Sequence, residues 1–291
     1  MSELINLIAA YLPSADIAAA YRRLRETRLF ILDMDGTIYL GERALDGAAE
    51  FVRALRALPG RRVLFFTNNA SRDIGYYEIK LQRLGFEPRD GELLSSAEVT
   101  ARHIVARHPG AAVFVLGTDY LRGVFEQYGI RTVGADCAAR PDIVVTSFDK
   151  SLNYPKLERA CTFIRDGALW LSTHPDVNCP TEYGFEPDCG AINACIAASV
   201  GGGAQPVYFG KPYRATIDAI QDLYGVPPEQ MAVFGDRLYT DVALGKLHGP
   251  LACLVLTGET KIADLAGLTE EKLPDLIFEK IGDAGEIKNN I

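Results

Sequence analysis

Short apolar runs that end in polar residues recur along the chain and alternate with segments of helical periodicity. Four of these runs are followed by polar residues that are candidates for catalysis or ligand binding. The runs are Leu29 to Leu32, Val63 to Phe66, Pro206 to Phe209 and Met231 to Phe234. Continuous apolar runs of this length predict strands that are buried on both faces. Strands that alternate with helices predict a parallel sheet, so the expected fold class is α/β with a doubly wound, Rossmann-like core.

The spacing of the four runs requires an inserted domain. Only about 26 residues separate the ends of the first two runs, whereas about 140 separate Asn69 from Gly210, too many for one crossover. The long segment has its own alternation, with strands predicted over 112–116, 142–145 and 169–171 and helices over 119–128, 154–166 and 190–200. We therefore expect a core of residues 1–90 and 205–291 and an inserted α/β domain over 91–204.

The core should carry further helices. Residues 46–58 and 71–84 have the pattern of crossover helices. Residues 1–28 form an extension before the first strand, in which Pro13 separates two predicted helices over 2–12 and 15–25. This extension is expected either to cover the core or to take part in a contact between subunits.

Composition and charge narrow the class of protein. The 291 residues are 48% hydrophobic, which suffices for two domain cores. The net charge of −8 argues against nucleic-acid binding, which needs a basic surface. No run reaches the ~18–20 apolar residues of a membrane helix. The six cysteines lack metal-type spacing and the N-terminus lacks a basic signal-peptide start, so a cytoplasmic protein is expected.

Carboxylates follow two of the four runs. Asp33 and Asp35 come directly after the first run, Asp236 follows the fourth, and Asp241 lies five residues further on. In an open α/β sheet the chemistry sits at the carboxyl ends of the strands, so these acids should lie near one another. Carboxylates suit Mg²⁺, which often shares its shell with a phosphate oxygen. The alternative is an acidic turn at Asp35 and Gly36 with no metal.

Phosphate-binding side chains follow the other two runs. Thr67 offers a hydroxyl and Asn68 a backbone N–H, and both are expected just before a helix start, where anions bind well. Lys211 follows the third run and supplies a positive charge. All four strand ends are expected to converge, which predicts a phosphate site with a metal. Asn69 is expected at most to cap the following helix.

In this order the four pieces resemble the four motifs of the haloacid dehalogenase (HAD) superfamily of phosphatases. The resemblance extends from about Leu29 to the end of the chain. A large α/β domain between the second and third motifs is similar to the type IIA branch, which includes 4-nitrophenylphosphatases, pyridoxal-phosphate phosphatases and nucleotidases.

The resemblance implies Mg²⁺-dependent hydrolysis of small phosphate monoesters through an aspartyl-phosphate. Asp33 would be the nucleophile and Asp35 the general acid and base. Asp33, the backbone carbonyl of Asp35, and Asp236 would hold Mg²⁺. Asp241 would hold a metal-bound water, or else be only an acid near a helix N-terminus. Thr67, Asn68 and Lys211 would bind the phosphoryl group.

A polar loop with two prolines lies inside the inserted domain, over residues 172–180. Its position matches the loop that reads the leaving group in this branch, so His174, Asp176 and Asn178 are candidates for substrate specificity. Relatives usually carry Asn in place of His174, and the loop could instead be a prolyl turn that satisfies its own backbone. Cys189 follows Asp188 at a predicted helix start; the neighbouring carboxylate favours an inert thiol.

Rival functions remain at this stage. A phosphotransferase or mutase could use the same core, and so could a non-catalytic regulator that binds a phosphorylated metabolite. A dinucleotide-dependent dehydrogenase is disfavoured because no G-x-G-x-x-G follows the first strand. The substrate could be a sugar phosphate, a nucleoside monophosphate or a similar metabolite. A homodimer through the inserted domain or the N-terminal extension is a further possibility.

Overall fold

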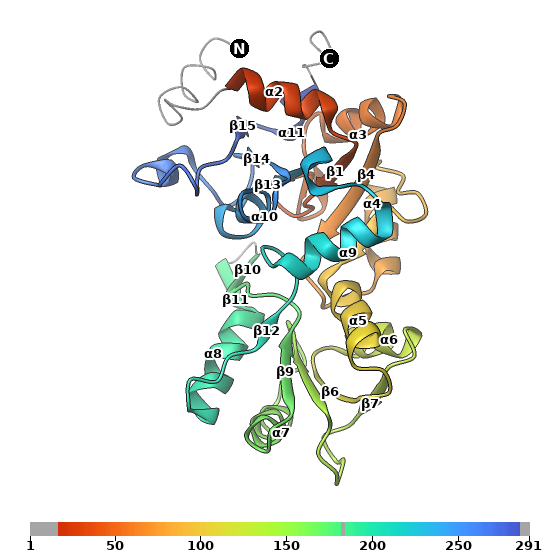
Figure 1. Cartoon of the computed structure of the whole chain (residues 1–291), viewed down its shortest axis with the longest axis vertical. Coiled ribbons are helices and arrows are strands. Elements are labelled where there is room, and N and C mark those ends of the chain that lie inside the picture. Colours follow the sequence, from red (N-terminus) through yellow and green to blue (C-terminus); the bar gives the residue numbers. More distant parts are fainter. Residues whose placement is uncertain (1–16, 182–183, 286–291) are drawn as a thin grey trace. The chain divides into compact units, whose positions relative to one another are not determined.

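The computed structural model of the chain describes residues 17–181 and 184–285, which form two compact units (Figure 1). The first unit comprises the described residues up to Phe66, Glu78–Leu93 and those from Ile220 onward; the second comprises Thr67–Tyr77 and Leu94–Ala219. The domain boundaries expected at residues 90 and 204 stay a prediction.

A six-stranded sheet in the order β15-β14-β13-β1-β4-β5 belongs mainly to the first unit, and its edge strand β5 continues into the second. Its strands are β1 (Leu29–Leu32), β4 (Arg62–Thr67), β5 (Leu93–Ser95), β13 (Met231–Gly235), β14 (Leu251–Val255) and β15 (Leu276–Phe278). From β15 to β4 all neighbours are parallel. The chain leaves β1 towards β4 and later returns to β13 on the other side, so the direction of winding reverses between β1 and β13. This switch point is where open α/β sheets bind ligands.

Both faces of this sheet are covered, as the prediction of a doubly wound fold requires. On one face, Phe51 of α3 packs against Phe30 and Phe234 with ring centroids 6.3 and 5.4 Å apart. On the other, Val242 and Leu265 join an apolar cluster with β14 and β15. The helices are α2 (Ile17–Glu26), α3 (Ala48–Arg56), α10 (Ala243–His248), α11 (Ile281–Gly285) and α4 (Ile74–Arg83), whose first turn belongs to the second unit.

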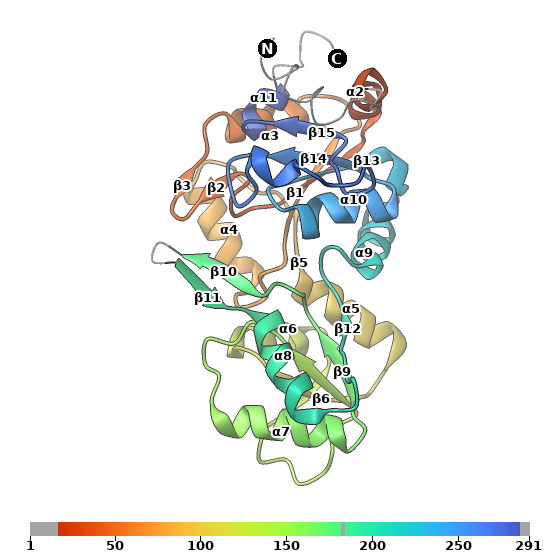
Figure 2. The ribbon, with the colours of Figure 1, turned by 90° about the vertical axis from the view of Figure 1, so that its left-hand side faces the viewer.

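The second unit contains a parallel five-stranded sheet in the order β12-β9-β8-β6-β7. Its strands are β6 (Ala112–Leu116), β7 (Arg131–Val133), β8 (Ile143–Thr146), β9 (Leu169–Ser172) and β12 (Val207–Tyr208), and its helices are α5 (Ser96–Arg107), α6 (Asp119–Gln127), α7 (Tyr154–Arg165), α8 (Cys189–Val200) and α9 (Arg214–Tyr224), which crosses into the first unit. Helices α7 and α8 share an apolar core with β6, β8 and β9 (Figure 2). The predicted α/β insertion is confirmed.

One predicted strand lies in a different sheet from the one expected. The run from Pro206 to Phe209 was predicted as a core strand, but β12 pairs with β9 in the second unit, with Val207 opposite Leu171. That assignment was wrong because an apolar run does not specify its partner. With Val207 51% exposed, β12 is a two-residue edge strand rather than a central one.

The remaining elements include one predicted helix and two strand pairs that the sequence did not predict. The helix predicted over 15–25 is present as α2, while the helix predicted over 2–12 lies outside the described residues. Two antiparallel pairs of strands were not predicted, β2 (Tyr39–Leu40) with β3 (Arg43–Ala44) and β10 (Asn178–Thr181) with β11 (Gly184–Pro187). Across the described part of the chain, no helix combines the length and hydropathy needed to span a bilayer.

Candidate active site

Three carboxylates gather at the switch point of the first unit. Asp33 and Asp236 follow the adjacent strands β1 and β13, and the Asp33 N–H donates to the Phe234 carbonyl at 2.8 Å. Asp241 lies in the short π-helical turn η2 (Leu238–Val242) that comes soon after β13. One carboxylate oxygen from each of the three lies within 4.8 Å of the others. The predicted proximity of these acids follows directly from the pairing of β1 with β13.

The backbone at Gly36 and Gly258 lies too close to the Asp236 carboxylate for either position to carry a side chain. Asp236 is 3% exposed, and its Oδ2 accepts the Glu259 N–H at 2.6 Å. A Cβ on Gly36, where φ is +81°, would lie 2.6 Å from Oδ2, and a Cβ on Gly258 would lie 1.9 Å from it. The other oxygen, Oδ1, is buried without a hydrogen-bond partner among the described residues. A buried oxygen without a hydrogen bond has lost its water partners and gained none in exchange, which is energetically unfavourable.

The electrostatics of the three carboxylates favour the binding of a cation. Burial, together with the charges of Asp33 and Asp241, raises the pKa of Asp236 to about 7. A divalent ion would remove this repulsion, and its oxygen-only surroundings suit a hard cation such as Mg²⁺. The uncompensated Oδ1 of Asp236 is a ready ligand. These residues therefore fit the metal that the sequence predicts.

The two acids of the first motif have different surroundings. The Thr37 hydroxyl donates to Asp33 Oδ2 at 3.2 Å, which orients this carboxylate. Asp35, two residues on, is exposed at its surface. Loss of surrounding water nonetheless raises the pKa of Asp35, while the charge of Lys80 lowers it and that of Asp33 raises it. A carboxyl group with a raised pKa is suited to proton transfer near neutral pH.

Asn68 and Lys211 form a compact pair in the second unit. The Lys211 N–H donates to Asn68 Oδ1 at 2.7 Å, and Asn68 Nδ2 donates to the Lys211 carbonyl at 3.0 Å. Both residues are buried, with Lys211 2% exposed. Thr67 is the last residue of β4, and its Oγ1 accepts the Asn69 N–H at 3.1 Å. Two of the three predicted phosphate ligands are thus joined directly, and the third precedes Asn68 in the chain.

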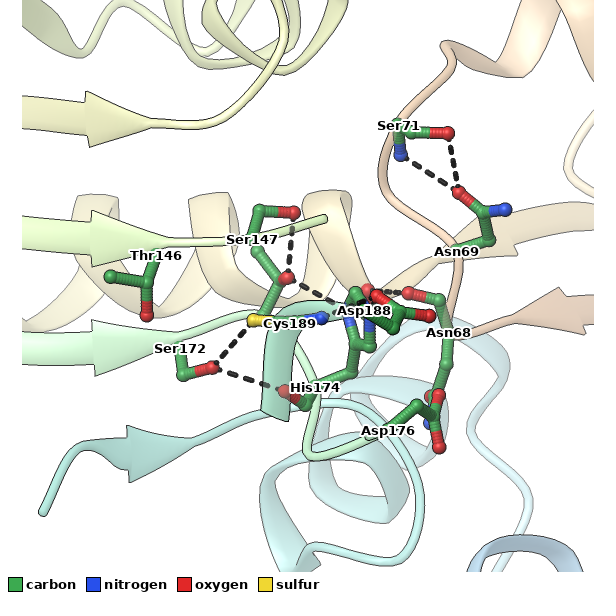
Figure 3. A network of polar contacts seen from close by, with 12 residues as sticks. Asn68, Asn69, Ser71, Thr146, Ser147, Ser172, His174, Asp176, Asp188 and Cys189 are labelled. Carbon is green, nitrogen blue, oxygen red and sulfur yellow. Dashed lines mark hydrogen bonds and ion pairs between the residues drawn. The ribbon is translucent and has the colours of Figure 1, made fainter. Parts of the chain in front are cut away.

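The predicted helix start after Thr67 and Asn68 is wrong. Helix α4 begins only at Ile74, so neither residue lies at its N-terminus. A bend intervenes, in which Asn69 Oδ1 accepts from Ser71 N at 3.0 Å and from Ser71 Oγ at 2.7 Å (Figure 3). Asn69 therefore stabilises a turn instead of capping the helix. An amide side chain favours both structures for the same reason, which is why the sequence did not distinguish them.

The candidate specificity residues differ in exposure. His174 and Asp176 are buried, with exposures of 0% and 3%, whereas Asn178 at the start of β10 is exposed. Asp188 pairs with His174, and one ligand atom each of His174, Asp176 and Asp188 lies within 4.8 Å of the other two. Sequence reasoning did not single out Asp188 for this role, although an acid just before a helix is a recognisable N-cap signal.

Cys189 is enclosed at the start of α8. Its side chain is 0% exposed and its Sγ lies 3.1 Å from Ser172 Oγ. Burial raises the pKa of the Cys189 thiol to about 12. A thiol in this environment is protonated at neutral pH and therefore a poor nucleophile.

The amino-acid sequence matches the models of one protein family. The sequence model of the haloacid dehalogenase-like hydrolases matches residues 30–131, and a second, described as HAD-hydrolase-like, matches residues 208–284. The 5′-nucleotidase YutF of Bacillus subtilis is 34% identical over 232 residues, which cover 80% of this chain and 88% of that protein.

Solved structures show the same likeness. A 4-nitrophenylphosphatase from Thermotoga maritima has 43% identity and a TM-score of 0.84, over 91% of this chain and 98% of that chain. A glycerol phosphate phosphatase from Mycobacterium tuberculosis, in complex with magnesium, has 30% identity and a TM-score of 0.79, over 89% of this chain and 76% of that one.

Proposed function

Because this chain belongs to the haloacid dehalogenase-like hydrolases, we propose that its phosphatase activity is a Mg²⁺-dependent hydrolysis of small phosphate monoesters through an aspartyl-phosphate. The observation that carries the proposal is the group of three carboxylates at the β1–β13 switch point, with one oxygen each within 4.8 Å. Carboxylates this close together repel one another unless a cation offsets their charge. Mg²⁺ bound to carboxylates commonly binds a substrate phosphate as well.

Asp33 and Asp35 divide the chemistry between them. The Asp33 carboxylate, oriented by Thr37, attacks phosphorus and forms a P–O bond as the bond to the leaving oxygen breaks. Asp35 gives its proton to that leaving oxygen, and its raised pKa favours the protonated form needed for this step. It then takes a proton from water, which attacks phosphorus and restores the Asp33 carboxylate.

Asp33, Asp236 and the Asp35 carbonyl are the proposed ligands of Mg²⁺, with Asp241 holding a metal-bound water. When bound, the ion offsets the negative charge of the carboxylates and of the transferring phosphoryl group. Thr67, Asn68 and Lys211 are proposed to bind the phosphoryl oxygens. Their place in the chain supports this role, because Thr67 ends β4, a neighbour of β1, and Asn68 holds Lys211.

The proposed substrate is a small phosphorylated metabolite. The relatives are a 5′-nucleotidase, a 4-nitrophenylphosphatase and a glycerol phosphate phosphatase. Their names indicate substrates that are all phosphate monoesters and that differ in the leaving group. We place recognition of the leaving group at Asn178, which is the exposed member of the three loop candidates. A cytoplasmic location and a homodimer remain predictions from sequence.

The test is release of inorganic phosphate from a panel of sugar phosphates, nucleoside monophosphates, glycerol phosphates and 4-nitrophenyl phosphate, with Mg²⁺ and with excess EDTA. Activity is expected with Mg²⁺ alone. The Asp33→Asn variant should retain the fold, shown by its thermal unfolding, and lose turnover. If it kept a tenth of wild-type activity, the covalent mechanism would be wrong; undiminished activity in EDTA would remove the metal.

A further inference from the structure

The loop between β9 and β10 is fixed to the start of α8 in the second unit. The Gly190 N–H donates to the Asp176 carbonyl at 2.7 Å. A Cβ on Gly190 would lie 2.3 Å from the Pro175 carbonyl oxygen, so this approach requires glycine. The Asp188 N–H adds a second bond, to the Val177 carbonyl, at 2.9 Å. The backbone of Asp176 therefore has a defined position.

His174 secures the same loop from within. Its Nε2 lies 2.8 Å from Asp188 Oδ1, which also accepts the Cys189 N–H at 2.5 Å as the N-cap of α8. Its Nδ1 lies 2.8 Å from Thr173 Oγ1, which donates to Ser147 Oγ at 2.9 Å (Figure 3). With both ring nitrogens engaged and no exposed surface, His174 anchors the loop.

The side chain of Asp176 acts on Asn68. Asp176 Oδ2 accepts a hydrogen bond from Asn68 Nδ2 at 3.1 Å. An amide can sit either way round, but a carboxylate only accepts hydrogen bonds when ionised. Asp176 and the Lys211 carbonyl, which accepts from the same Nδ2 at 3.0 Å, therefore favour the same orientation of the Asn68 amide. In that orientation Asn68 Oδ1 is the acceptor for the Lys211 N–H, as observed at 2.7 Å.

The packing beside Lys211 leaves little space for another arrangement. Gly210 has a φ of +73°, and a Cβ there would lie 2.7 Å from Asn68 Oδ1 and 2.8 Å from the Thr173 carbonyl oxygen. The backbone that carries Lys211 thus lies against both Asn68 and the loop of Asp176. A rotation of the Asn68 side-chain amide would therefore displace the backbone of Gly210 and Lys211.

We propose that Asp176 is a positioning residue, which holds the Asn68 amide in the orientation that fixes Lys211 for phosphate binding. This inference rests on the proposed function, since it takes Lys211 as the cation that receives the phosphoryl group. Asp176 acts on every substrate alike, because the phosphoryl group is common to all. Small misplacements of such a cation weaken its effect strongly.

The first test compares variants of Asp176 over a panel of phosphate esters that includes 4-nitrophenyl phosphate. Asp176→Ala should lower kcat/KM by about tenfold or more on every ester, because an unanchored amide no longer fixes Lys211. Asp176→Asn should recover activity to within about threefold, because its amide oxygen still accepts from Asn68. Asp166→Ala, an exposed acid at the end of α7, is the matched control and should match wild type.

If Asp176→Ala fails to fold, Asp176→Leu has a similar size, lacks the acceptor and carries the same expectation. A changed ranking of substrates would overturn the proposal and assign the loop to the leaving group. Wild-type rates in Asp176→Leu would overturn it too.

A double-mutant cycle separates positioning from an independent effect. If Asp176 acts only through Asn68, adding Asp176→Ala to Asn68→Ala should lower kcat/KM no further. Additive losses would overturn the proposal.

Binding of inorganic phosphate, measured by titration calorimetry, gives a readout that does not depend on turnover. Weaker binding in Asp176→Ala than in wild type supports positioning, and equal binding would overturn it. A wild-type chain that binds phosphate but hydrolyses none of the esters would refute the proposed function and leave this comparison valid.

Discussion

Gly258 determines where the Asp236 carboxylate can lie. A Cβ on Gly258 would come within 1.9 Å of Asp236 Oδ2 and 2.7 Å of its Cβ, so any side chain there must move the acid. The same oxygen accepts the Glu259 N–H at 2.6 Å, and that bond would be lost with the movement. The position of one proposed metal ligand thus depends on the absence of a side chain in another part of the chain.

Replacement of Gly258 by alanine should therefore weaken the metal site. Gly258→Ala is expected to raise the Mg²⁺ concentration for half-maximal activity by about tenfold or more, the usual effect of disturbing the support of a metal ligand. Gly123→Ala in α6 is the control, because a Cβ there meets nothing within 4 Å. An unchanged Mg²⁺ requirement in Gly258→Ala would mean that Asp236 does not bind the ion.

The raised pKa of Asp236 predicts how stability depends on pH without metal. A carboxyl group with a folded-state pKa of about 7 is protonated when folded at pH values where it is ionised when unfolded. In that pH range the unfolded state binds fewer protons than the folded state. The contribution of Asp236 to the free energy of unfolding therefore falls from about pH 4 to about pH 7, by an amount on the order of a few kcal/mol.

The measurement is the free energy of unfolding by urea in EDTA at several pH values, for wild type and Asp236→Asn. The variant should lack this part of the decline, and Mg²⁺ should restore wild-type stability near pH 7. Parallel pH profiles for the two proteins would show that Asp236 is ionised normally.

Substitution of Asp35 tests the general acid. Asp35→Asn should lose about 10²–10⁴-fold in kcat on alkyl phosphates, the usual contribution of a positioned acid or base. The loss should be smaller for 4-nitrophenyl phosphate when bond cleavage limits the rate, because nitrophenolate leaves without a proton. Equal losses on both substrates would argue against protonation of the leaving group by Asp35.

Burial predicts that Cys189 is chemically inert. Its pKa of about 12 leaves almost no thiolate at pH 8, whereas Cys195 on the same helix is exposed. Iodoacetamide at pH 8 should modify Cys195 within minutes to hours and leave Cys189 unmodified in the native protein, as read by peptide mass spectrometry. Modification of Cys189 at a rate similar to that of Cys195 would contradict the enclosed environment.

Structural features that depend on residues close together in the sequence were predictable. The runs before Asp33 and Asp236 are buried strands, and an acid that follows a strand directly is carried to its end by the chain itself. The insertion was predictable for a similar reason, because its length exceeds any crossover. Local turn chemistry was less certain, as the bend after Asn69 shows.

Sequence alone determined the α/β class, the inserted domain and the candidate catalytic acids, because hydrophobic period and strand-end position are local properties of the chain. Tertiary structure decided the rest. Asn68 meets Asp176 across 108 positions and Lys211 across 143, and β12 joins the sheet of the second unit. Such pairings depend on which surfaces pack together, and many partners satisfy the same local pattern. Only the folded chain therefore shows that Asp176 is buried against Asn68.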